Sequence, residues 1–140
     1  MPSVELTMVI PGISDDGDPV LTTRKIHVNT ERIAYFHGTP DGDQTMLQCD
    51  GGAHVHLRHT GPEIIQKLKA VRRDELEEYQ RFTMIATDKT GQIKVPVLIN
   101  EKKVNLIVPN PDETASIQVG NGYVLHVEQD INQVRVALGF

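Results

Sequence analysis

The sequence VNTERIAYF, from Val28 to Phe36, indicates how the chain is organised, because the chain contains a second version of it. The second version is INEKKVNLI, from Ile99 to Ile107, at an offset of 71 positions. In both versions an extended run leads through a tight turn, at Asn29 or Asn100, into another extended run. A segment that recurs in this way indicates a duplicated structural unit.

The correspondence continues on both sides of this stretch in the same order. Upstream, ELTMVI (Glu5 to Ile10) matches RFTMIA (Arg81 to Ala86). Downstream, the matched pairs are Pro40 with Pro111, Asp41 with Asp112, Val55 with Leu125, Leu57 with Val127, Ile64 with Val134, and Leu68 with Leu138. The offset changes only in loops, so we interpret the chain as a tandem duplication.

Each unit reads as a series of short strands. Val4, Leu6, Met8 and Ile10 alternate with other residues at a period of two, which is typical of a half-buried strand. Four further extended runs follow, separated by turn-rich segments such as GISDDGDP and GTPDGD. In the third run we expect one face to carry the core residues, namely Ile33 and Tyr35, and Val104 and Leu106 in the second unit.

A helix is predicted to close each unit. Thr60 and Glu63 form a capping-box pattern, in which each side chain bonds the other residue's backbone amide. An apolar stripe follows at helical spacing, made of Ile64, Ile65, Leu68 and Val71. In the second unit Val134 and Leu138 keep part of that stripe.

These patterns predict a mainly β (α+β) fold with two tandem antiparallel β-meander units, each closed by a short C-terminal helix. We place the first unit at 1–71, a charged linker or helix extension at 72–79, and the second unit at 80–140. Units of this size have little core of their own, so the two should pack together or pair through their sheet edges.

Three histidines in six residues raise the question of a metal site. His54 and His56 share one face of a predicted strand, and His59 or His37 could add a further zinc ligand. The second unit, however, has Val124 in place of His54, and no HExxH, cysteine pair or carboxylate cluster completes a ligand set. We therefore expect a solvent-facing strand and no metal, with His54, His56 and His59 as the candidates if a metal does bind.

The sequence shows no pattern that indicates catalysis. Cys49 is the single cysteine, and we interpret it as an ordinary small strand residue in a chain without a disulfide framework. GxGxxG and GxxxxGK[ST] are both absent, so no nucleotide cofactor is expected. With no signal peptide and no apolar run of membrane-spanning length, we expect a cytoplasmic or virion protein that is not an enzyme.

The pattern at VNTERIAYF, LQCDGGAHVHL and PEIIQKL, and again at INEKKVNLI, IQVGNGYVLHV and INQVRVAL, resembles the small FlbD-like module of flagellar operons and short bacteriophage proteins. It is also similar to the core of LytTR DNA-binding domains. The LytTR resemblance implies that loops and basic residues enter the grooves of DNA. In this chain the matching loops, GTPDGD and PNPDET, are acidic.

From these features we expect a non-enzymatic assembly or interaction protein that forms a homo-oligomer. The FlbD-like resemblance implies that it is a phage virion structural or accessory component. The formal net charge of -5 gives no overall attraction to phosphates, so nucleic acid is not the expected main partner. One alternative is a nucleic-acid-binding regulator that uses Arg24, Lys25, Lys102 and Lys103. A second alternative is a metal-binding or small-molecule-binding module at His54 and His56.

Overall fold

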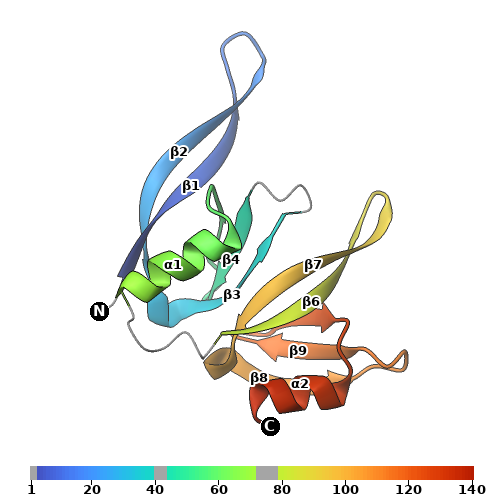
Figure 1. Ribbon diagram of the computed structural model, residues 1–140. Helices are drawn as coiled ribbons and strands as arrows, with labels where there is room; N and C mark the ends of the chain where they lie inside the picture. The colour runs from blue at the N-terminus through green and yellow to red at the C-terminus, as the bar shows by residue number, and fades with distance from the viewer. Residues whose placement is uncertain (1–2, 40–43, 72–78) are drawn as a thin grey trace.

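The computed structural model describes residues 3–39, 44–71 and 79–140 (Figure 1). The first half contains β1 (Ser3–Ile13), β2 (Pro19–Asn29), the 3₁₀ helix η1 (Thr30–Arg32), β3 (Ile33–Gly38), β4 (Thr45–Cys49), β5 (His54–Leu57) and α1 (Gly61–Val71). The second half contains β6 (Tyr79–Asp88), β7 (Gly91–Asn100), η3 (Glu101–Lys103), β8 (Val104–Pro109), β9 (Ala115–Val119), β10 (Tyr123–Val127) and α2 (Ile131–Leu138). The predicted mainly β fold is confirmed. Of the proposed linker at 72–79, residues 72–78 lie outside the described residues, and Tyr79 is the first residue of β6.

The strands form one ten-stranded antiparallel sheet in the order β2-β1-β5-β4-β3-β7-β6-β10-β9-β8. Both halves therefore have the same internal order. The prediction of a simple meander is wrong at one connection, because β3 does not pair with β2 and β5 returns to pair with β1 at Leu57 and Met8. Hydrophobic periodicity identifies strands but does not specify which strands pair, and this is why the order could not be read from the sequence.

Among the described residues, both strand pairing and side-chain contacts join the halves. The first is the pairing of β3 with β7, in which Phe36 lies opposite Leu98. The second is between side chains: Gln48 of β4 donates from Nε2 to the Tyr123 hydroxyl of β10 at 3.0 Å. The halves therefore both share a sheet edge and pack against each other, and β2 and β8 are the outer strands of the order.

A β-bulge in β3 changes which residues face the core. The register shifts between Ile33 and Tyr35, so Ile33 joins the hydrophobic cluster of the first half and Tyr35 joins that of the second. The prediction that these two side chains share a face is therefore wrong, because a bulge inserts a residue into the alternation. β8 has the same irregularity, and there Leu106, predicted as core, is 45% exposed.

Each helix covers the sheet of its own half (Figure 1). Ile64 and Leu68 of α1 are fully buried with Leu6, Phe36 and Leu47. In α2, Val134 and Leu138 are buried in the second cluster, as predicted. Val71 was also predicted to pack, but it is 44% exposed, because it is the last residue of α1.

The helix starts are fixed by the same local chemistry in both halves. The predicted capping box of α1 is confirmed: the Thr60 amide donates to Glu63 Oε1 at 3.3 Å and the Glu63 amide donates to Thr60 Oγ1 at 3.4 Å. α2 begins with an equivalent box between Asp130 and Gln133. Among the helices of the described ranges, none is both long enough and apolar enough to cross a membrane.

Candidate nucleic-acid interface

β2 provides an edge that is open to a ligand. As the first strand of the order, it pairs with β1 on one side and has no strand on the other within the described parts of the chain. Every residue from Pro19 to Lys25 is exposed. In an antiparallel edge strand alternate backbone N–H groups point outward, so this edge offers hydrogen-bond donors to a partner.

The exposed part of β2 also carries hydroxyl and cationic side chains. Thr22 and Arg24 lie on one face of the strand, and Thr23 and Lys25 lie on the other, because side chains alternate. Lys25 Nζ is 3.5 Å from Glu5 Oε1, but both side chains are more than half exposed (76% and 51%), so this ion pair is weak. Hydroxyls, cations and backbone amides are the groups that contact nucleic-acid phosphates.

The position of this edge suits contact with a duplex. β1 and β2 form a two-stranded ribbon that extends beyond the rest of the molecule (Figure 1). The projecting tip carries Asp15, Asp16 and Asp18, which repel phosphates. The favourable stretch lies nearer the sheet, at Arg24 and Lys25, where β1 also pairs with β5.

The other predicted basic pair does not belong to this surface. Lys102 and Lys103 lie in η3, between β7 and β8, whereas Arg24 and Lys25 lie on β2. Lys103 Nζ is 2.8 Å from Asp50 Oδ2, so its charge is already paired. The two basic pairs therefore lie on different elements and do not form one surface.

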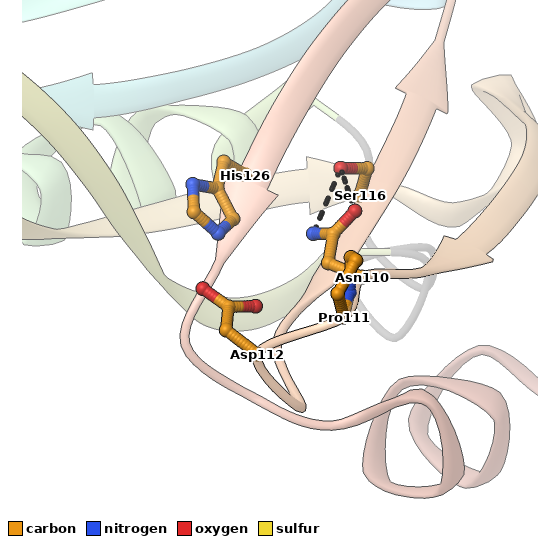
Figure 2. Close-up of a pocket in the computed structure, with 5 residues that line it drawn as sticks. All are labelled: Asn110, Pro111, Asp112, Ser116 and His126. Carbon is orange, nitrogen blue, oxygen red and sulfur yellow. Dashed lines mark hydrogen bonds between the residues drawn. The ribbon is translucent and has the colours of Figure 1, made fainter.

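A polar pocket of about 480 Å³ lies between the β8–β9 loop and β10 (Figure 2). Thr114, the next residue but one after Asp112, connects two of its lining residues: its hydroxyl donates to Asp112 Oδ1 at 2.5 Å and lies 2.7 Å from His126 Nε2. Asn110 donates from Nδ2 to Thr114 Oγ1 and to Ser116 Oγ, both at 3.1 Å. The hydrogen bonds from the Thr114 hydroxyl and the Thr114 backbone amide lower the pKa of the Asp112 carboxyl.

These hydrogen bonds hold the β8–β9 loop in place. Its polar side chains satisfy one another, and they tie the β8–β9 loop to His126 of β10. The ionised Asp112 opposes a phosphate in the same place. The sequence indicates only an acidic loop at PNPDET and does not predict this cluster. The available signal was the position of Asn110 and Thr114 on either side of the turn residues Pro111 and Asp112.

The candidate metal ligands lie in different settings. His54 and His56 are exposed on β5. His59 Nε2 accepts a hydrogen bond from the Thr7 amide at 3.0 Å, and His59 Nδ1 lies 3.6 Å from Glu63 Oε2. His37 lies with its Nδ1 2.9 Å from the Gly38 carbonyl oxygen. Over the ranges that the structure describes, no three His, Cys, Asp or Glu side chains come together as a metal cluster.

Cys49 is half-buried at the end of β4. Burial raises the pKa of its thiol, and the neighbouring Asp50 carboxylate raises it further. A reactive cysteine requires the opposite shift, because the thiolate is the nucleophile.

No protein-family model matches the chain, and no curated protein matches it significantly. One solved structure does resemble it: the LytTR DNA-binding domain of a response regulator from Bacillus cereus. The two share 16% sequence identity and superpose with a TM-score of 0.50, over 95% of this chain and 98% of the other. The likeness shows a LytTR-like fold over nearly the whole chain.

This finding corrects the functional expectations drawn from the sequence. A phage structural or accessory protein, acting through oligomerisation and protein surfaces, was the wrong reading. So was the expectation that nucleic acid is not the main partner, because the resembling structure is a DNA-binding domain. The net charge does not reveal a local patch, since it averages over the acidic ribbon tip and the separate cationic stretch of β2.

Proposed function

We propose that this protein is a DNA-binding regulator without catalytic activity, and that the free edge of β2 is the surface that contacts the phosphates. The observation that carries the proposal is the likeness to a LytTR DNA-binding domain across nearly the full length of both chains. The alternating hydroxyl and cationic side chains from Thr22 to Lys25 supply the chemistry.

The charge distribution defines the kind of binding expected. The chain carries 19 acidic and 14 basic residues, so attraction is confined to a local patch. Two cations, Arg24 and Lys25, can each neutralise one phosphate and release its counterions. Binding should therefore be weak away from a specific site and should weaken as salt increases.

The test is fluorescence anisotropy with a labelled duplex of about 30 base pairs, titrated at several salt concentrations. We expect saturable binding whose logarithmic affinity falls linearly with the logarithm of salt concentration. Absence of binding to any duplex at low salt, in a selection from random sequences, would contradict the proposal.

We also propose that the two halves, 1–71 and 80–140, are copies of one unit. The support is a shared hydrogen-bond pattern at equivalent places. The Thr7 amide donates to the His59 side chain, and the Thr83 amide donates to the Gln129 side chain at 3.1 Å. Asn29 and Asn100 likewise cap η1 and η3, each accepting at 3.0 Å from the backbone amide two residues ahead.

A further inference from the structure

A groove lies where β3 of the first half pairs with β7 of the second, on the side of the sheet that carries α1. It has a volume of about 530 Å³, within the range of small-molecule sites. Pro96 and Leu98 of β7 lie on one side of it, and Pro62 and Ile65 of α1 lie on another. Phe36 of β3 borders it as well, but its side chain is fully buried. Both halves of the chain therefore contribute to it.

One permanent charge lies in this largely apolar lining. Arg81 of β6 pairs in register with Leu98, which itself pairs with Phe36, so the three side chains follow one another across three adjacent strands. At the usual strand spacing Arg81 is about 10 Å from Phe36. Arg81 is exposed, and in the described ranges no carboxylate forms an ion pair with it.

We propose that the groove binds a small aromatic carboxylate. The planar ring would lie against Leu98 and Ile65, and the carboxylate would meet the Arg81 guanidinium. Guanidinium and carboxylate match in charge and in two-pronged geometry. The lining contains no aspartate or glutamate among the described residues, so a cationic ligand has no partner there.

The proposal goes beyond DNA binding and does not depend on it, since β2 does not line the groove. The ligand contacts α1 and β3 of the first half and β6 and β7 of the second. It should therefore stabilise the folded chain, because a ligand that binds only the native state raises the free energy of unfolding.

The probes are 2-naphthoate and its uncharged analogue 2-naphthamide, each titrated into the full chain and followed by ¹H–¹⁵N correlation spectra. We expect the shift changes to cluster at the amides of Gly38, Gly61, Ile65 and Leu98. The Kd of 2-naphthoate should be about tenfold lower than that of 2-naphthamide, because only the anion pairs with Arg81.

Three variants make the test specific. Arg81→Gln should weaken 2-naphthoate about tenfold and leave 2-naphthamide unchanged. Lys94→Gln, which removes a cation from the same face of β7 outside the groove, should change neither Kd. Gln66→Trp places a ring in the groove and should weaken both probes while the spectrum remains that of a folded protein.

Two results would overturn the proposal. One is a set of shift changes that lies away from the groove residues. The other is an Arg81→Gln variant that binds 2-naphthoate as tightly as the wild type does. The DNA-binding proposal is tested separately: an Arg24 variant that loses DNA binding should still bind 2-naphthoate with the wild-type Kd.

Discussion

Lys103 Nζ lies 2.8 Å from Asp50 Oδ2 and so joins η3 of the second half to the β4–β5 turn of the first. The side chains are only 25% and 12% exposed, and Asp50 Oδ1 is buried without a hydrogen-bond partner among the described residues. Lys103→Met should therefore destabilise the protein by about 2 kcal/mol, because it leaves a mostly buried carboxylate without its countercharge. Urea unfolding followed by circular dichroism measures this loss.

The matched control is Lys94→Met. Lys94 Nζ is 2.6 Å from Glu128 Oε1, but these side chains are 59% and 47% exposed. We expect a loss below about 1 kcal/mol, since water screens the pair. Equal losses in the two variants would show that the Lys103 contact has no special role in joining the halves.

Replacing Gly120 by a residue with a side chain is predicted to destabilise the protein. Its φ is +61°, and an added Cβ would lie 2.6 Å from Asp50 Oδ1. Gly51 has a φ of +88° with no atom within 4 Å of an added Cβ. Gly51→Ala therefore measures the cost of a positive φ without a clash. Gly120→Ala should lower the free energy of unfolding by at least about 1 kcal/mol more than Gly51→Ala, because it adds a clash to the backbone strain. If thermal unfolding ranks them the other way, the close contact at Asp50 is wrong.

His59 and Gln129 are predicted to be interchangeable. Each side chain accepts from the amide of a threonine in the neighbouring strand, Thr7 or Thr83. His59→Gln should therefore retain most of the stability, whereas His59→Leu should lose about 1 to 3 kcal/mol, because the Thr7 amide is left unpaired. Chemical unfolding of both variants provides the comparison, and similar losses would count against a shared role.

The Cys49 thiol should ionise at higher pH in the folded protein than in the unfolded one. Burial and the Asp50 carboxylate both raise its pKa, so at a given pH less thiolate is present to react. The rate of alkylation by iodoacetamide should rise with a midpoint at higher pH in the native protein than in urea. Coincident midpoints would contradict the environment described for Cys49.

The elements of the fold were largely predictable from the sequence. Thr60 and Glu63 fixed the start of α1 through local hydrogen bonds, and Val134 and Leu138 marked α2 by their spacing. The bulge between Ile33 and Tyr35 was not predictable, because it depends on pairing with a strand that the periodicity does not identify.

The functional surfaces were harder to foresee for the same reason. Arg24 and Lys25 were recognised as a pair, but only the strand order shows that β2 is an open edge. The sequence does not predict a role for Arg81, since its neighbours Leu98, Phe36 and Ile65 come from three other elements. The low identity to the resembling structure is consistent with cores that tolerate many hydrophobic substitutions.

The most direct test of DNA binding through β2 compares the Arg24→Gln, Lys25→Gln double variant with wild type over a range of salt. If each cation neutralises one phosphate, the slope of log K against log salt should decrease in magnitude by about 2. The Lys94→Gln variant should keep the wild-type slope. An unchanged slope and affinity in the double variant, or an equal decrease in the Lys94→Gln control, would contradict the account.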